Sequence, residues 1–352
     1  MPIWMYVLLG VGAAALVARV LGLPPILIFV LSAAGLVPMA ALIGRSTEDL
    51  AQHVGPKFGG LLNATFGNAA ELIIGAIALR EGLLSLVKAS ITGSIIGNTL
   101  LVLGMSIVLG GMRHGVQTFD AREATRNSTM MLIALASLVT PAAFAAVDPD
   151  RVAIEEISVA VALLLLLVYA AYIAFSLTPA GQTVLAEEVG PHAEEGRQSW
   201  SQRTALLVLV GATVATVLLA ETLVGTVEAF THALGWSEFF VGLIVVPLVG
   251  NIAEHFSAVQ LAGKNKLETS LAIAAGSSTQ IALLVAPVLV LLGLAFGHWL
   301  TLVFHPLEIV AVGTAAVIFT VVSVDGESNW LEGVQLLTLY VMLAVVFFFL
   351  RV

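Results

Sequence analysis

The chain of 352 residues is 59% hydrophobic and 11% charged, with a mean hydropathy of +1.04. A soluble domain carries roughly 25% charged residues, so this composition excludes a soluble globular protein. Apolar runs of about 20 residues recur along the whole chain, which indicates membrane-spanning helices and not a barrel. The net charge of −9 indicates no particular partner, and the lack of Cys excludes disulfides and thiolate metal sites.

Hydropathy predicts eleven spans. They are residues 4–22, 24–43, 58–79, 83–111, 128–147, 155–177, 203–228, 237–262, 267–296, 300–323 and 330–350. The first segment has no basic stretch before it and no A-x-A site after it, so we expect a retained span and not a signal peptide. The predicted fold class is all-α, a polytopic membrane protein of about 11 transmembrane helices.

One stretch occurs twice. Gly67-Asn68-Ala69-Ala70-Glu71 in the third span corresponds to Gly250-Asn251-Ile252-Ala253-Glu254 in the eighth, and Gly93-Ser94 corresponds to Gly276-Ser277. Both pairs are offset by 183 residues (250 − 67 and 276 − 93). A carboxylate near the bilayer centre costs roughly 3 kcal/mol on insertion scales and usually marks an ion or proton path. Two carboxylates at matched positions therefore predict transport.

The duplication divides the chain into four parts. Residues 1–23 form an N-terminal helix, 24–177 and 203–352 form two five-helix repeats, and 178–202 link them. Because five is odd, the second repeat is inverted relative to the first, as in secondary transporters with a site near the midplane. Residues before the two motifs, such as Lys57 and Ser237, are thus expected to face opposite membrane surfaces.

Basic residues in the loops predict the orientation. One side holds Arg45, Lys57, Arg113, Arg122, Arg126, Arg197, Arg203, Lys264 and Lys266, and the other holds Arg19, Arg80, Lys88, Arg151 and Arg351. Nine against five places the N-terminus in the cytoplasm and the C-terminus outside. The linker contains Glu187, Glu188, Glu194 and Glu195. A solvated tether explains these acids, and a calcium-sensing or pore-shielding segment is the alternative.

Each motif directs an amide and a carboxylate to one helix face, because Asn68 and Glu71, like Asn251 and Glu254, are three residues apart. The glycines loosen the helix and free backbone carbonyls for coordination. Carboxylates with carbonyls form an all-oxygen cage, which favours Ca²⁺ over Mg²⁺.

The following span of each repeat adds polar groups without carboxylates. They are Ser94, Asn98, Ser277, Ser278, Thr279 and Gln280. Ser278 and Thr279 are more typical of helix packing than of ligation, whereas Asn98 and Gln280 fit either role. His255 fits a packed neutral imidazole as well as a proton relay. Glu221, Glu228, Glu308 and Glu332 lie near span ends and need no functional role.

Residues 59–74 (GGLLNATFGNAAELII) closely resemble the first α-repeat of the CAX family of Ca²⁺/H⁺ antiporters, within the cation/calcium exchanger superfamily. Residues 250–255 (GNIAEH) and 276–280 (GSSTQ) resemble its second α-repeat, although Ile252 stands where a small residue is common. The resemblance implies that Glu71 and Glu254 bind Ca²⁺ and H⁺ in turn. It also implies that Asn68, Asn98, Asn251 and Gln280 surround the ion path and that the linker is the family's acidic segment.

The expected function is Ca²⁺/H⁺ exchange by alternating access, with Ca²⁺ as a transported substrate and no prosthetic group. A sodium/calcium or other divalent cation exchanger is the alternative, although sites for several Na⁺ generally need a further carboxylate. A channel fits an inverted repeat less well, and an enzyme lacks H-E-x-x-H or G-x-S-x-G in any span. Expected partners are Ca²⁺, H⁺ and the bilayer, with no nucleic acid and a homo-oligomer left open. The short N-terminus favours a prokaryotic inner membrane.

Overall fold

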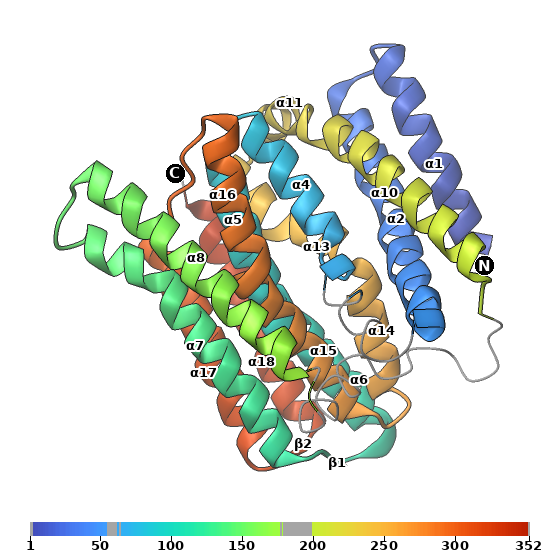
Figure 1. The fold of residues 1–352 in the computed structure, drawn as a ribbon. Coiled ribbons are helices and arrows are strands. Elements are labelled where there is room, and N and C mark those ends of the chain that lie inside the picture. Colours follow the sequence, from blue (N-terminus) through green and yellow to red (C-terminus); the bar gives the residue numbers. More distant parts are fainter. Residues whose placement is uncertain (1–2, 55–61, 63–64, 177, 179–198, 351–352) are drawn as a thin grey trace.

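The computed structural model describes residues 3–54, 62, 65–176, 178 and 199–350, and these are almost wholly helical (Figure 1). Helices satisfy backbone hydrogen bonds within one segment, which lipid requires. The first half contains α1 (Ile3–Val20), α2 (Pro25–Val54), α4 (Ala69–Arg80), α5 (Leu84–Ile96), the π-helical η1 (Gly97–Val102), α6 (Leu103–His114), β1 (Gln117–Thr118), α7 (Ala121–Ala145) and α8 (Arg151–Ser176).

The second half repeats this order of long and broken helices. It contains α10 (Gln202–Val224), α11 (Val227–Leu234), α12 (Glu238–Phe240), the π-helical η2 (Val241–Val245), α13 (Val246–Gly250), α14 (Ile252–Ala262), α15 (Leu267–Gln280), the π-helical η3 (Ile281–Val285), α16 (Ala286–Phe296), α17 (Pro306–Val324), β2 (Glu327–Ser328) and α18 (Trp330–Phe349). Strands β1 and β2 form one short antiparallel pair, with Gln117 opposite Ser328.

The prediction of an all-helical, multi-span membrane protein is confirmed, but the count of eleven is not. Nine of the described helices are long and apolar enough to cross a membrane, and the bent pair Val227–Leu234 with Glu238–Gly250 makes ten. The predicted span 237–262 is interrupted at its motif, and α4 begins inside the first motif, at Ala69. The predicted and observed numbers of spans differ because α4, with 12 described residues, is too short to be counted as a span.

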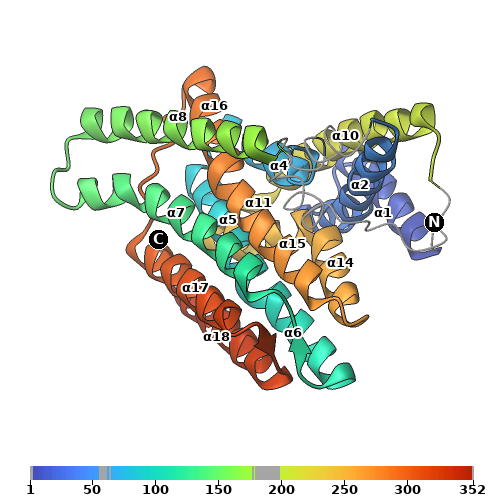
Figure 2. The ribbon, with the colours of Figure 1, turned by 60° about the horizontal axis from the view of Figure 1, so that its bottom comes forward.

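Helices α1, α2 and α10 lie together along one side of the molecule, and both ribbon views show this unit (Figures 1 and 2). Helices α4 and α14 both contact it, and they stand between it and the remaining helices. On the far side α17 packs against α7 and α18 against α6. The two helices that carry the glutamates are therefore at the boundary between two packed bodies.

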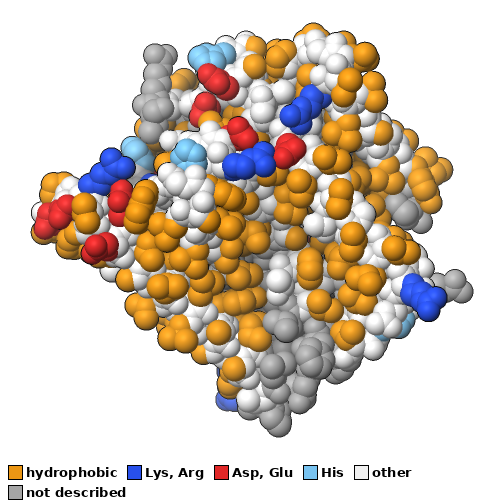
Figure 3. Space-filling model, turned by 45° about the horizontal axis from the view of Figure 1, so that its top comes forward, with side chains coloured by type: hydrophobic (Ala, Val, Ile, Leu, Met, Phe, Trp, Pro, Cys, Tyr) orange, Lys and Arg blue, Asp and Glu red, His pale blue; other side chains and the backbone are white. Residues whose placement is uncertain are grey.

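The two motif helices end at opposite ends of the bundle. The last residue of α4, Arg80, pairs with Glu221 near the end of α10, with Nη2 3.1 Å from Oε1. The last turn of α14 is held by Gln117, whose Nε2 donates to the Ala262 carbonyl at 3.1 Å. We call the end with Arg113 and Lys264 the basic end, and the other the opposite end. Charged side chains gather over the opposite end, whereas apolar ones cover much of the flanks (Figure 3).

Candidate cation site

Both motifs break the helix at the asparagine. Asn68 has φ −99° and ψ 22°, and Asn251 has φ −94° and ψ 5°, so each leaves the helical region and precedes a new helix. Glu71 and Glu254 then occupy the third position of α4 and α14, in the first turn. The positive end of each helix dipole is within one turn of its carboxylate, which stabilises negative charge there. The loosening expected at Gly67 and Gly250 is found one residue later, at Asn68 and Asn251.

Three of the four carboxylate oxygens of the two glutamates are buried and have no hydrogen-bond partner among the described residues. This holds for both oxygens of Glu71 and for Oε2 of Glu254. Glu71 lies against the other repeat, because a Cβ on Gly250 would be 3.0 Å from Glu71 Oε1. A buried carboxylate without a partner is costly, so these oxygens require a cation or a proton.

Two hydrogen bonds cross between the repeats in a symmetric pair. Asn251 Nδ2 donates to Ser94 Oγ at 3.2 Å, and Ser277 Oγ donates to Asn68 Oδ1 at 3.4 Å. These four residues are related by the 183-residue offset (251 − 68 and 277 − 94). The duplication seen in the sequence therefore corresponds to two matching contacts around the glutamates.

Three side chains break this symmetry, because the offset relates Gln280 to Gly97, Asn98 to Ile281 and His255 to Leu72. Gln280 Oε1 accepts from Asn68 Nδ2 at 2.6 Å, and Asn98 Nδ2 donates to Ser277 Oγ at 2.9 Å. His255 Nε2 lies 3.1 Å from Asn98 Oδ1.

The extra bonds make the two motif amides unequal. Asn68 has both its amide nitrogen and its amide oxygen engaged. Asn251 Oδ1 is buried and has no hydrogen-bond partner among the described residues. A cation near the glutamates therefore has one free amide oxygen available, from the second motif.

The hydroxyl groups separate into two kinds. Ser94 and Ser277 face the motif asparagines, whereas Ser278 Oγ donates to the Ala274 carbonyl of its own helix at 2.9 Å. Ser278 is fully buried and Thr279 is nearly so. The packing interpretation of Ser278 therefore agrees with its hydrogen bond.

A cavity of about 750 Å³ leads away from the site. Gly250, Glu254 and Gln280 line its deep end, and Arg45, Glu48 and Gln260 line it near the basic end. Towards the opposite end the helices pack closely, since a Cβ on Gly242 would be 2.7 Å from the Leu86 carbonyl oxygen. The glutamates are therefore approached from the basic end.

The profile of the family described as sodium/calcium exchanger protein matches residues 24–178 and 204–349. The chain belongs to this exchanger family. It is 42% identical over 340 residues to a Ca²⁺/H⁺ antiporter of Synechocystis, covering 92% of this chain and 91% of the relative. It is 38% identical over 347 residues to the Ca²⁺/H⁺ antiporter ChaA of Bacillus subtilis, covering 98% and 99%. The resemblance to the CAX antiporters is confirmed by these relatives.

Solved structures of exchangers share the fold of this family member. The native YfkE structure superposes with a TM-score of 0.85 at 36% identity, covering 98% of this chain and 100% of that one. The H⁺/Ca²⁺ exchanger CAX gives a TM-score of 0.72 at 13% identity, covering 98% and 91%, which shows the fold alone.

The four glutamates of the linker, Glu187, Glu188, Glu194 and Glu195, lie outside the described residues. The end of the linker is held to α2 near Arg45, which lines the cavity. The Trp200 N–H donates to Asp49 Oδ2 at 3.1 Å, and the Arg45 guanidinium lies 3.9 Å above the Trp200 ring. The end of the linker is thus anchored beside the route to the site.

Sequence reasoning missed a polar cluster in the half of the bundle nearer the opposite end. Glu308 is only 2% exposed, and its Oε1 accepts from Thr92 Oγ1 at 2.8 Å. Lys88, one turn before Thr92 on α5, donates to Thr301 and to the Val303 carbonyl. Thr92 and Ser94 are about 200° apart on α5, so the cluster lies behind the site and holds its helix. No spacing in the sequence could reveal these contacts, which join residues more than 200 positions apart.

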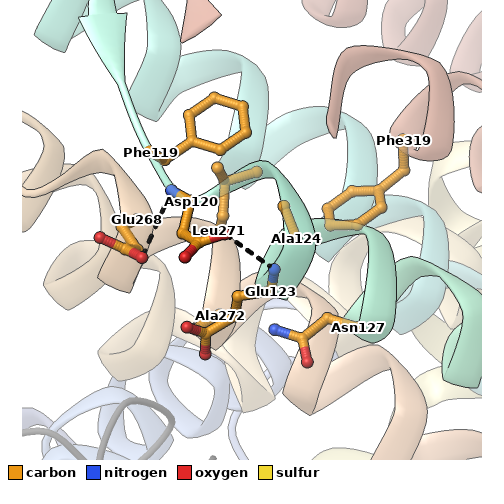
Figure 4. Close-up of a pocket in the computed structure, with 9 residues that line it drawn as sticks. All are labelled: Phe119, Asp120, Glu123, Ala124, Asn127, Glu268, Leu271, Ala272 and Phe319. Atoms are coloured by element: carbon orange, nitrogen blue, oxygen red, sulfur yellow. Dashed lines mark hydrogen bonds between the residues drawn. The ribbon is translucent and has the colours of Figure 1, made fainter. Parts of the chain in front are cut away.

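A second hollow at the start of α7 is too small to be the site (Figure 4). It measures about 10 Å³, room for about one water molecule, although Asp120, Glu123 and Glu268 line it. Asp120 Oδ1 caps α7 by accepting from the Arg122 and Glu123 amides. In the described part of the chain, no three His, Cys, Asp or Glu side chains are grouped to hold a metal. These acids therefore have a structural role at the helix start.

Proposed function

We propose that the protein exchanges Ca²⁺ for H⁺ across a membrane, with Glu71 and Glu254 as the shared site. The observation that carries the proposal is the pair of glutamates, three of whose four carboxylate oxygens are buried without hydrogen-bond partners among the described residues. Glu254 lines the cavity, and Glu71 packs against Gly250, which also lines it. The names of the relatives from Synechocystis and Bacillus subtilis support the same activity. The transported Ca²⁺ is the substrate, and the chemistry requires no prosthetic group.

Charge balance explains the coupling. Two ionised glutamates neutralise one Ca²⁺, and the same two groups are neutral when each holds a proton. The doubly ionised, empty site leaves two buried negative charges unpaired and is the costly state. Protein rearrangement with an empty site is thereby disfavoured, so each ion leaves in exchange for the other. Apparent Ca²⁺ affinity falls as the pH is lowered, because protons compete for the same oxygens.

Uptake of ⁴⁵Ca²⁺ into proteoliposomes tests this function. An imposed pH gradient, acidic inside, should drive Ca²⁺ accumulation without any Na⁺ gradient, and a protonophore should abolish it. Accumulation that follows a Na⁺ gradient and ignores the pH gradient would favour the sodium/calcium exchanger instead. That alternative is disfavoured because the grouped donors at the site are two carboxylates with amides and hydroxyls, without a third carboxylate among the described residues.

The ligand set proposed for Ca²⁺ is Glu71, Glu254 and the Asn251 amide oxygen, completed by backbone carbonyls and water. Asn68, Asn98 and Gln280 were predicted as ligands, and their hydrogen bonds support a role in holding the site together. The His255 ring contacts the Asn98 amide and not a glutamate, so its proposed role is to hold that amide in place. Ser94 and Ser277 orient the motif asparagines.

The unequal amides give a testable difference. Asn251→Ala should raise the Ca²⁺ concentration at half-maximal uptake by about tenfold or more, because it removes a ligand oxygen. Asn68→Ala should lower the thermal stability and the maximal rate more than the Ca²⁺ affinity, because Asn68 binds Gln280 and Ser277. Concentration dependence of uptake and melting temperature are measured on both purified variants. Equal loss of affinity in both would contradict the assignment.

The repeats and the orientation are proposed together with alternating access. Residues 24–177 and 203–352 form two inverted repeats, with the N-terminus in the cytoplasm and the cavity open to that side. This supports an inner-membrane protein in which the α1, α2 and α10 unit moves relative to the rest.

Thiol labelling checks this topology, since no native Cys interferes. Glu81 follows α4 and Lys264 follows α14, and both are exposed. An impermeant maleimide should reach Glu81→Cys only from outside and Lys264→Cys only from the cytoplasm. Labelling of both from one side would mean that the repeats are parallel.

A further inference from the structure

The cavity is far larger than a cation requires. Its volume of about 750 Å³ lies within the range of about 300–1,000 Å³ that is typical of sites for drug-sized molecules. A metal ion at the glutamates would fill only the deep end. Most of the cavity would remain unfilled by the ion.

The walls are mainly apolar. Helix α2 contributes Val37 and Ala41, α6 contributes Met105, and α14 contributes Ile252 and Phe256, with Phe66 before α4. Glu254 lines the same cavity, two residues before Phe256 on α14. The space therefore combines an apolar body with an acidic end.

We propose that this cavity binds amphiphilic organic monocations, compounds with a quaternary ammonium head and a short apolar tail. The ammonium group lies against Glu254 at the cavity wall, with Glu71 next to the cavity-lining Gly250. There it supplies a positive charge to carboxylate oxygens that have no hydrogen-bond partners among the described residues. The tail lies along Val37, Ile252 and Phe256 and is removed from water. The site follows from charge and shape complementarity and goes beyond Ca²⁺/H⁺ exchange.

Such a cation occupies the site without completing transport. One positive charge leaves one of two ionised glutamates unbalanced, so the second must take a proton when the ammonium binds. The ligand also fills the route between the glutamates and the basic end. It therefore competes with Ca²⁺ and blocks exchange from the side to which the cavity opens.

Calorimetric titration of the purified protein in detergent with hexyltrimethylammonium tests the binding without relying on transport. We expect one site per chain, displacement by millimolar Ca²⁺, and affinity that rises about fourfold per methylene from propyl to hexyl. Tetramethylammonium, which has the charge without the tail, should bind at least tenfold more weakly. A quaternary ammonium group carries no proton, so these compounds cannot transport protons across the membrane. Any inhibition of pH-driven ⁴⁵Ca²⁺ uptake would therefore not come from loss of the pH gradient.

Variants distinguish binding in this cavity from non-specific partition of the ligand into detergent. Glu254→Gln should weaken hexyltrimethylammonium binding at least tenfold, and Glu71→Gln provides the same test if the first variant does not fold. Val37→Asn should flatten the dependence on tail length, while Val30→Asn, seven residues earlier on α2 and exposed, should leave it unchanged. Binding that is equal in wild type and both Gln variants, or that does not change with the tail, overturns the proposal. Binding that Ca²⁺ displaces in a protein without pH-driven uptake would overturn the antiport proposal and leave this one standing.

Discussion

Glu71→Gln and Glu254→Gln should each reduce pH-driven Ca²⁺ uptake by about 100-fold or more while leaving the protein folded and inserted. The amide keeps the size of the side chain and removes its charge. One remaining carboxylate neither neutralises Ca²⁺ nor releases two protons for it. Three of the four carboxylate oxygens have no hydrogen-bond partner among the described residues, so the change should break few contacts that stabilise the fold.

The measurement is ⁴⁵Ca²⁺ uptake in proteoliposomes, normalised to monomer recovered from size-exclusion chromatography. Glu228→Gln is the matched control, because Glu228 also occupies the first turn of a short helix but is exposed at the surface. It should exchange Ca²⁺ normally. If either Glu71→Gln or Glu254→Gln exchanges Ca²⁺ at a near-normal rate, that residue does not belong to the site.

Gly93→Ala should strongly destabilise the protein, whereas Gly97→Ala, one turn along the same helix, should not. A Cβ on Gly93 would collide with the Leu243 carbonyl and lie 2.7 Å from Pro247 Cγ, so α5 could not stay in contact with η2 and α13. A Cβ on Gly97 meets nothing within 4 Å. Overpacking typically costs about 1–3 kcal/mol, and contact with backbone leaves less room for relief.

Melting temperatures and the yield of monodisperse protein measure this difference. Gly97→Ala is expected to be neutral or slightly stabilised, since Ala favours the helix by roughly 0.5–1 kcal/mol over Gly. Any Gly93→Ala protein that folds should also transport poorly, because the neighbouring Ser94 would lose its bond to Asn251. Equal stability of the two variants would mean that the close contact of α5 with Leu243 is not required.

The glycine that precedes the serine in each repeat has a different environment in the two repeats. Gly93 and Gly276 occupy matched positions, yet Gly93 is pressed against the other repeat and Gly276 lines the cavity. An internal repeat predicts that two positions are related by symmetry. It does not predict which position is in close contact and which lines a cavity. In this conformation the helices pack closely at one end of the molecule and leave a cavity at the other.

The sequence by itself predicted the helical membrane fold, a weakened helix at each motif and the matched positions of Glu71 and Glu254 in the two repeats. Hydropathy and the 183-residue offset are local or periodic signals, and the physics of lipid leaves few alternatives to helices. The tertiary structure alone decided that Asn68 is engaged while Asn251 keeps a free oxygen, that Glu308 meets Thr92, and that the cavity opens at the basic end. Those features depend on side chains brought together from positions more than 150 residues apart, for which no spacing rule exists.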